Sequence, residues 1–459
     1  MRPAQWRRST HVVIGLAVVL IVALVVVVAA LLRGSHSSDA EAIAPAPAPA
    51  TADPGITPVS DSAGTPAPDR LAATLAMTLA DPNLGIFTGR IADAVTGKQL
   101  WAQGANIPMQ PASVTKVLTT SAALLGLDRD ARLTTTVLAS DRRPGVVVLK
   151  GGGDPTLSAA PKGQDTWYHD AARISDLADQ VRQSGTRVTA VQVDVSAFSG
   201  PTMAPGWDPL DIDGGDIAPM EAVMLDAGRT QPVSVDSARS TTPALDAGRA
   251  LAVALRVDPA TVTVLPSAFD GQEIASVQSP PLIDRLREMM NNSDNVMAES
   301  IGREVAAAKG QPQSFDGSVR AVLGELESAE IDTGGSHLVD CSGLSVDDRL
   351  TADTLDGAVG AAAGPHHPTL RPLLDLLPIA GGSGTLSNRF IDTDAGRSSL
   401  GWLRAKTGSL TGTNTLVGIV TDASGRVLTF ALMSNNAGPT GRTAIDAFAA
   451  TLRSCGCGS

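Results

Sequence analysis

Apolar residues recur along the chain with two spacings, and the spacing predicts helices and strands. Leu71, Leu75 and Leu79 lie four positions apart, which predicts a helix over 70–80. Short alternating or continuous apolar runs instead predict strands. The other expected helices are 114–127, 171–183, 281–290, 295–308 and 440–452, and the expected strands are two within 85–103, then 134–138, 146–149, 188–195, 404–410, 416–421 and 427–433.

This order of elements predicts an α+β fold assembled from distant parts of the chain. We expect 70–128 and 276–454 to form one domain, in which an antiparallel sheet packs against a helical lobe. Between them, 129–275 alternates strand-like pieces with loops rich in Gly, Pro and Asp, which indicates one or two inserted β-rich domains. A chain of 459 residues is also longer than one compact domain usually is.

The longest continuous apolar run lies near the N-terminus. Basic residues precede an uncharged stretch over 12–32, which as a helix would be about 31 Å long and would cross a bilayer. Because a positive flank stays inside, we expect 1–11 in the cytoplasm, 12–32 as an uncleaved membrane anchor and the remainder outside. The alternative is a cleaved signal peptide ending near Ala40-Glu-Ala42. Residues 33–69 are rich in Ala and Pro and predict an extended linker.

Composition excludes some classes of function. The net charge is −12 and aromatic residues make up 3% of the chain, which argues against nucleic-acid binding through a basic surface or stacked bases. The cysteines are Cys341, Cys455 and Cys457, without the C-x-x-C spacing of a zinc or redox site. We expect no metal and no cofactor. A disulfide from Cys341 to a tail cysteine, or a buried unpaired Cys341, both remain open.

The first chemical motif is Ser113-Val-Thr-Lys116, at the start of an apolar helix. A hydroxyl there faces unpaired backbone N–H groups, and one helical turn places the Lys116 amine on the same face as Ser113. A lysine becomes a base when burial or a neighbouring cation lowers its pKa. The ordinary alternative is a helix cap followed by a surface lysine, and this motif alone would be weak.

The second motif, Ser293-Asp-Asn295, falls between two predicted helices. In a turn, Ser293 and Asn295 can both point into a cleft, where a hydroxyl relays a proton and an amide binds substrate backbone. The alternative is helix capping, since Ser, Asp and Asn are favoured caps.

The third motif, Lys406-Thr-Gly408, lies on a predicted strand and is the most specific of the three. The Lys406 charge and the Thr407 hydroxyl can bind a terminal carboxylate, and Gly408 lets a substrate strand approach the backbone. The alternative is an exposed edge strand with an incidental lysine. No histidine lies in a G-x-S-x-G or H-E-x-x-H context, so other common hydrolases are not indicated.

These three motifs in this order are typical of penicillin-binding proteins and class A β-lactamases. The chain resembles the low-molecular-mass penicillin-binding proteins of the D-alanyl-D-alanine carboxypeptidase/endopeptidase family with a large insertion after S-x-x-K (peptidase family S13). The resemblance covers about 70–452 and departs at Cys341, where the family usually has Gly or Asn. It also rests on Gly151-Gly-Gly-Asp-Pro-Thr-Leu157, Asp194-Val-Ser-Ala-Phe198, Ala204-Pro-Gly-Trp207, Ser342-Gly-Leu-Ser345 and Lys406-Thr-Gly-Ser-Leu410.

The resemblance implies a penicillin-binding-protein/β-lactamase-like transpeptidase fold and a serine-type D-Ala-D-Ala carboxypeptidase that trims peptidoglycan stem peptides. Ser113 would be the nucleophile, Lys116 its base and Ser293 the proton relay. Asn295, Lys406, Thr407 and Gly408 would hold substrate, and the N–H groups of Ser113 and Ser409 would form the oxyanion hole. β-Lactams would acylate Ser113 in the same way.

Some alternatives remain at this stage. An acid beside the cleft would select the amine of a diamino acid in the stem, and Asp194 is the candidate, with Asp154 better explained as a turn former. The same site would serve an endopeptidase that cuts cross-links, and a non-catalytic penicillin-binding scaffold would keep the fold without turnover. Because no E-x-x-L-N follows the second motif, we expect the acyl-enzyme formed with a β-lactam to be hydrolysed slowly, which makes the protein a penicillin target and not an efficient β-lactamase.

Overall fold

The computed structural model describes residues 20–25, 27–28 and 63–455. By its internal packing the chain divides into two units, Met1–Pro58 and Val59–Ser459. Within the described residues, no helix combines the length and the apolar character needed to cross a membrane. The predicted anchor 12–32 and linker 33–69 fall mostly outside the described residues and stay predictions.

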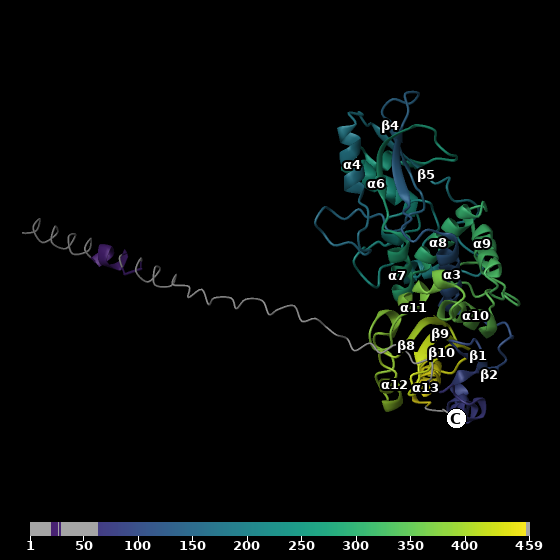
Figure 1. Cartoon of the computed structure of the whole chain (residues 1–459). Coiled ribbons are helices and arrows are strands. Elements are labelled where there is room, and N and C mark those ends of the chain that lie inside the picture. Colours follow the sequence, from purple (N-terminus) through teal and green to yellow (C-terminus); the bar gives the residue numbers. More distant parts are fainter. Residues whose placement is uncertain (1–19, 26, 29–62, 456–459) are drawn as a thin grey trace, which may run out of the picture. The chain divides into compact units, whose positions relative to one another are not determined.

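Between residues 63 and 455 the chain forms two five-stranded sheets with helices around them (Figure 1). The elements match the helices and strands expected from the apolar spacing, and add helices and two strands of the second sheet that the spacing did not reveal. The helices are α2 (Pro68–Leu79), α3 (Thr115–Gly126), α4 (Ile174–Gln183), α5 (Leu210–Gly214), α6 (Pro243–Leu255), α7 (Leu282–Asn292), α8 (Asn295–Ala308), α9 (Phe315–Ser328), α10 (Ala352–Ala363), α11 (Pro372–Leu376), α12 (Asp394–Ser398) and α13 (Gly441–Ser454).

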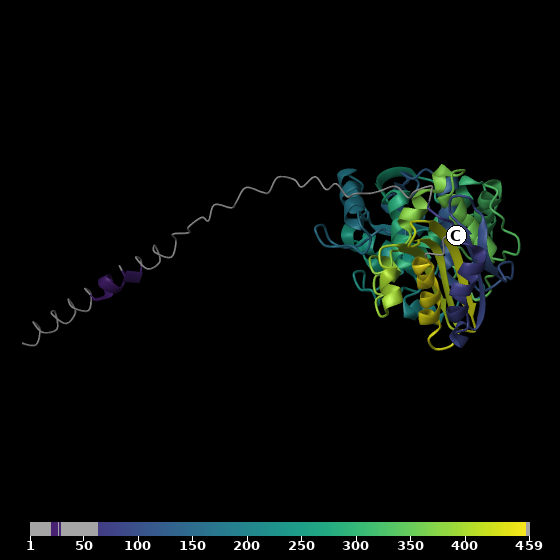
Figure 2. The ribbon, with the colours of Figure 1, turned by 60° about the horizontal axis from the view of Figure 1, so that its bottom comes forward.

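The first sheet has the order β2-β1-β10-β9-β8 and is antiparallel throughout. Its strands come from both ends of the unit, as Figure 2 shows in blue and yellow. This arrangement places the Lys406 motif on the edge strand. The bounds are β1 (Ile86–Asp93), β2 (Gln99–Gln103), β8 (Leu403–Leu410), β9 (Thr413–Thr421) and β10 (Val427–Asn435).

Both faces of this sheet are covered, as its central strand shows. In β10, Leu428, Phe430 and Leu432 pack with α2 and α13 in one apolar cluster, whereas Ala431 and Met433 face the helical lobe in another. Successive strand residues point to opposite faces, so β10 is apolar on both. At the end of the sheet where β1 finishes and β10 begins, the Arg426 guanidinium donates a hydrogen bond to the Asp93 carboxylate.

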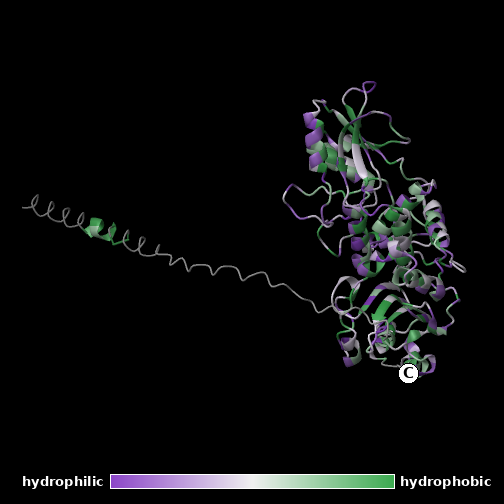
Figure 3. Cartoon of the chain, in the orientation of Figure 1, coloured by the Kyte–Doolittle hydropathy of each residue, from purple (hydrophilic) through white to green (hydrophobic). Residues whose placement is uncertain are grey.

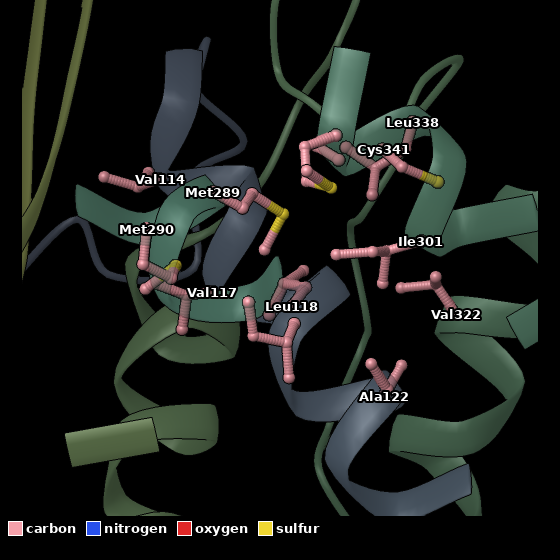
Figure 4. Close-up of a cluster of buried hydrophobic side chains, with 14 of the residues drawn as sticks. Val114, Val117, Leu118, Ala122, Met289, Met290, Ile301, Val322, Leu338 and Cys341 are labelled. Atoms are coloured by element: carbon pink, nitrogen blue, oxygen red, sulfur yellow. The ribbon is translucent and has the colours of Figure 1, made fainter. Parts of the chain in front are cut away.

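The helical lobe joins α3, α7, α8, α9, α10 and α11 around one apolar cluster. Figure 4 shows its centre, where Val117 and Leu118 of α3 meet Met289 of α7 and Ile301 of α8. The first two motifs lie at the ends of these helices, since Ser113 precedes α3 and Ser293 lies between α7 and α8. Packing of the lobe therefore sets the distance between them.

The second sheet has the order β6-β5-β4-β3-β7, with β4, β5 and β6 parallel and β3 antiparallel to both of its neighbours. Helices α4 and α6 pack on it over a separate apolar core. Apolar residues are concentrated in its strands, while α4 carries a polar outer surface (Figure 3). The bounds are β3 (Thr134–Ala139), β4 (Val146–Lys150), β5 (Ala190–Asp194), β6 (Thr263–Val264) and β7 (Gln272–Gln278).

Cys341 is a free, buried cysteine, so the disulfide that we considered between Cys341 and the C-terminal tail is wrong. Cys455 is disulfide-bonded without it. Burial raises the pKa of the Cys341 thiol well above its ordinary value. Its sulfur instead fills the space beside Gly302 of α8, where a Cβ atom would lie 2.5 Å from Sγ.

Replacing Gly302 by alanine will therefore destabilise the protein by about 1–3 kcal/mol, because the added methyl group overlaps the Cys341 sulfur. The free energy of unfolding from denaturant titration measures this cost. Gly324→Ala is the matched control on α9, where a Cβ meets nothing within 4 Å, and we expect it to be neutral or stabilising. The cost of Gly302→Ala will shrink in a Cys341→Ala background; equal costs in both backgrounds would contradict the proposed overlap.

Candidate active site

The three motifs meet at one open cavity of about 610 Å³ between the helical lobe and the edge strand β8. Ser113, Ser293, Asn295, Thr407 and Ser409 all line it. The cavity is also lined by Leu344 and Leu410, from two of the family-like segments, and by residues that the sequence did not suggest, namely Asp211, Asp216, Asn292, Thr385, Asn388, Arg389, Thr411 and Arg442.

Ser113 is half-buried on a single 3₁₀ turn, Ala112–Val114, that leads into α3. The turn is strained, because Ala112 has a φ of +52°, a region that favours glycine. A hydrogen bond from the Thr415 hydroxyl to the Pro111 carbonyl, at 2.7 Å, ties this turn to the sheet. Ser113 thus lies just before the first residue of α3, near the positive end of the helix dipole.

Lys116 is fully buried, and its ammonium group has three acceptors from three parts of the chain. The Nζ atom lies 3.0 Å from Ser113 Oγ, 2.6 Å from Asn295 Oδ1 and 2.7 Å from the Ser342 carbonyl oxygen. Burial lowers the pKa of Lys116 to about 8, even though the charge of Asp340 and other acids pulls it up. The lysine can therefore release its proton near neutral pH while touching the serine.

Lys406 is the second buried amine of the site. It donates to Ser293 Oγ at 2.9 Å and to the Thr407 carbonyl at 2.8 Å. Burial first, and the positive charge of Lys116 second, hold the pKa of Lys406 well below its ordinary value. A negative group of a ligand would supply the missing counter-charge.

Ser293 and Asn295 occupy the turn between α7 and α8. Ser293 adopts a left-handed conformation, with φ 58° and ψ 36°, that caps α7, while the Asp294 side chain caps α8 by accepting from Met297 N. Asn295 receives the Lys116 ammonium on Oδ1 and donates from Nδ2 to the Asp216 carbonyl at 3.0 Å. In this motif the Asp294 side chain therefore caps a helix, whereas the Ser293 and Asn295 side chains are the ones available for the candidate chemistry.

The edge strand β8 brings Thr407 and Ser409 to the cavity. The Thr407 hydroxyl is 2.8 Å from that of Thr385. Gly408 has a different reason to be glycine from the approach of substrate that we expected: a Cβ there would lie 2.1 Å from Thr415 Oγ1 and 3.0 Å from Ser113 N. The missing side chain lets β8 lie directly against the Ser113 turn.

The loop 340–345 contains the Ser342 carbonyl that accepts from Lys116, and its first residue, Asp340, was not assigned a chemical role from the sequence. Its carboxylate accepts hydrogen bonds from the backbone N–H groups of Ser342, Gly343 and Ser345 and from the Trp207 indole. These bonds fix the Ser342 carbonyl that Lys116 uses. In the sequence, only the neighbouring segment Ser342-Gly-Leu-Ser345 pointed to this loop. The four donors that converge on the Asp340 carboxylate become apparent only in the folded chain.

The structure does not bring Asp194 to the cavity, which corrects its assignment to substrate binding. Asp194 lies at the end of β5, almost fully buried, and its two oxygens accept from Ser196 N and Phe269 N at 2.9 Å each. It is a loop cap in the second sheet. Asp154 likewise accepts from Thr156 N and Oγ1.

The acids that do line the cavity are Asp211 and Asp216, from the loop around α5. Burial raises the pKa of both, and the charge of Asp216 raises that of Asp211 further. Arg389 and Arg442 are the basic residues of the lining, and Arg389 is paired with Asp446. In the described part of the chain, no three His, Cys, Asp or Glu side chains are grouped so as to hold a metal.

Comparison with protein families identifies both units. Residues 71–238 and 233–452 match the D-Ala-D-Ala carboxypeptidase 3 (S13) family, and residues 1–58 match the N-terminal domain of Rv3627c-like carboxypeptidases. The chain is 72% identical to carboxypeptidase DacB of Mycolicibacterium smegmatis and 61% identical to carboxypeptidase Rv3627c of Mycobacterium tuberculosis. Both alignments cover all of this chain and all of the relative.

A solved structure supports the fold. The crystal structure of penicillin-binding protein 4 (dacB) from Haemophilus influenzae matches with a TM-score of 0.69 at 23% identity, over 84% of this chain and 98% of that one. The α+β fold expected from the order of elements and the family resemblance stated from the motifs are both confirmed. With matches over most of its length, this chain belongs to the D-Ala-D-Ala carboxypeptidase 3 (S13) family.

Proposed function

We propose that the protein is a serine-type D-Ala-D-Ala carboxypeptidase that trims peptidoglycan stem peptides through an acyl-enzyme. The observation that carries the proposal is the contact between Ser113 Oγ and Lys116 Nζ at 3.0 Å, with the pKa of Lys116 lowered to about 8 by burial. A serine beside a lysine of this kind is an activated nucleophile. Family membership and the shared names of close relatives support the same activity.

In the acylation step, Lys116, Ser113 and Ser293 act in turn. Neutral Lys116 takes the proton of Ser113, and Oγ attacks the carbonyl carbon of the penultimate D-alanine. The N–H groups of Ser113 and Ser409 stabilise the oxyanion, whose charge develops beside the positive end of α3. The proton held by Lys116 is then relayed through Ser293 to the leaving amine as the C–N bond breaks, releasing D-alanine. Water hydrolyses the resulting ester and restores Ser113.

The third motif recognises the end of the substrate. The terminal carboxylate of D-alanine binds Lys406 and the Thr407 hydroxyl, and it supplies the counter-charge that buried Lys406 lacks. Asn295, already oriented by Lys116 and the Asp216 carbonyl, hydrogen-bonds the stem backbone. Penicillin presents a carboxylate beside a strained amide and would acylate Ser113 in the same orientation.

Its place in the cell follows from its substrate. Peptidoglycan lies outside the cytoplasmic membrane, so the unit 59–459 would be extracytoplasmic. The apolar run 12–32, within a segment that matches the N-terminal domain of a carboxypeptidase group, would anchor it, with 1–11 inside and 33–69 as the linker. We assign the peptidase domain to 70–128 and 276–454, and the insertion to 129–275.

Ser113→Ala will abolish D-alanine release from a D-Ala-D-Ala-terminated stem peptide by the full-length protein, because no other group replaces the attacking oxygen. Covalent labelling by fluorescent penicillin will vanish in the same variant. Retained D-alanine release with Ser113→Ala would reject Ser113 as the nucleophile. Labelling of the wild type without release would reject the carboxypeptidase activity.

The rate of acylation will rise with pH, with a midpoint near 8. Lys116 acts as a base only when neutral, and it is neutral above its pKa, which burial lowers to about 8. Below this value the protonated fraction grows and the rate falls about tenfold per pH unit. Stopped-flow measurement of penicillin acylation from pH 6 to 10 tests this. A flat profile between pH 7 and 9 would exclude Lys116 as the base.

The purified protein will turn nitrocefin over slowly after a rapid first acylation. The chain lacks the E-x-x-L-N sequence that class A β-lactamases use to activate the deacylating water. The expected record is a burst equal to the amount of protein, followed by a rate far below the acylation rate. Continuous fast hydrolysis would show that the chain supplies another base for deacylation.

A further inference from the structure

The turn that carries Ser293 is held from behind by a residue of the insertion. The Tyr168 hydroxyl donates a hydrogen bond of 2.5 Å to Asp294 Oδ2. Tyr168 is 1% exposed and Asp294 is 6% exposed, so water competes little for this bond. Asp294 is the middle residue of the Ser-Asp-Asn motif, and nothing in the proposed reaction uses its side chain.

This turn needs support because it borders two cavities. The cavity of about 610 Å³ that Ser113 lines and a second cavity of about 570 Å³ are both lined by Asn292, Ser293 and Asn295. Ser293 also holds a left-handed backbone conformation that is unfavourable for a non-glycine residue. A strained turn that borders two cavities depends on specific hydrogen bonds to keep its position.

Asp294 is the centre of those bonds. Its Oδ1 accepts from Met297 N at 3.0 Å, which starts α8, and its Oδ2 accepts from Tyr168. Burial alone would raise the pKa of Asp294, but the Arg239 charge and the Tyr168 hydroxyl outweigh it, so the carboxyl stays ionised. Without the hydroxyl, one oxygen of a buried carboxylate would lose its partner, which is costly.

Tyr168 is itself fixed in place. Its backbone carbonyl accepts from the Thr166 hydroxyl at 2.7 Å, and the neighbouring Trp167 ring lies 3.6 Å from the Arg229 guanidinium carbon. Burial, and then the charge of Asp294, raise the pKa of Tyr168 well above its ordinary value. The phenol therefore remains a donor throughout the working pH range.

We propose that Tyr168 is a positioning residue for the proton relay: through Asp294 it holds Ser293 Oγ against Lys406 in the geometry that delivers a proton to the leaving amine. The proposal rests on the proposed function. It gives the insertion a part in the chemical step, in addition to lining the cleft with Asp211 and Asp216.

The test compares Tyr168→Phe with Ser158→Ala in the full-length protein. Ser158 is the matched control, because its buried hydroxyl also donates to a buried acid of the insertion, Asp226 Oδ2 at 3.1 Å, away from the three motifs. Tyr168→Phe loses one buried hydrogen bond, and Ser158→Ala loses two, since the Ser158 hydroxyl also accepts from Ala160 N at 3.1 Å, so the melting temperature of the control will fall at least as far. The readouts are the penicillin acylation rate and kcat and KM for D-alanine release.

We expect Tyr168→Phe to slow acylation and lower kcat by about tenfold or more, with KM changed less than about twofold. Ser158→Ala will acylate at the wild-type rate. End-point penicillin labelling corrects each rate for the fraction of folded protein. A Tyr168→Phe variant that acylates as fast as Ser158→Ala would overturn the proposal and leave Tyr168 with a structural role.

A second measurement needs no variant. Tyr168 is the only tyrosine of the chain, so protein made with tyrosine labelled at ¹³Cζ gives a single tyrosine resonance. Acylation of Ser113 by penicillin will shift it, because the leaving nitrogen contacts the turn that Tyr168 holds. An unshifted resonance would contradict the coupling even if Tyr168→Phe fails to fold. Failure of the wild type to take up penicillin would instead reject the proposed function.

Discussion

The active site depends on one buried amine and the three oxygens around it. Lys116 reaches Ser113 on the 3₁₀ turn that precedes its helix, Asn295 at the start of α8 and the Ser342 carbonyl in a loop after α9. An ammonium group removed from water needs such partners, and burial then makes its neutral form accessible at ordinary pH. Each partner comes from a different part of the lobe, so the lobe has to be packed correctly before the lysine can act as a base.

The first sheet supplies the remaining side chains of the active site. Gly408 lets β8 lie against the Ser113 turn, and Thr415 on the neighbouring strand bonds the Pro111 carbonyl. This contact puts Lys406 within reach of Ser293 and places Thr407 and Ser409 on the cavity wall. Two lysines buried close together disfavour each other's charge, so a carboxylate-bearing substrate suits the site better than a neutral one.

Much of this could be predicted from the sequence, because helices and strands leave apolar periodicities and the three motifs leave local signatures. The helix after Ser113, the strand of Lys406 and the turn of Ser293 all lie where the spacing predicted them. Asp340 and Tyr168 could not be found this way. Tyr168 acts on Asp294, more than a hundred residues away, and the local bonds of Asp340 matter because they fix the carbonyl used by Lys116, which is also more than a hundred residues away. Asp194 was misjudged for a related reason: a family-like segment does not reveal whether its acid faces the cleft or caps a loop.

The most direct test of the account is the pKa of Lys116 itself. Lysines labelled at ¹³Cε in the full-length protein report their own titration, and the resonance lost in Lys116→Arg identifies this residue. The account predicts a titration midpoint of about 8, well below the 10.5 of an ordinary lysine. A Lys116 that titrates at the ordinary value would contradict a buried, preorganised base, and with it the mechanism built on the contact to Ser113.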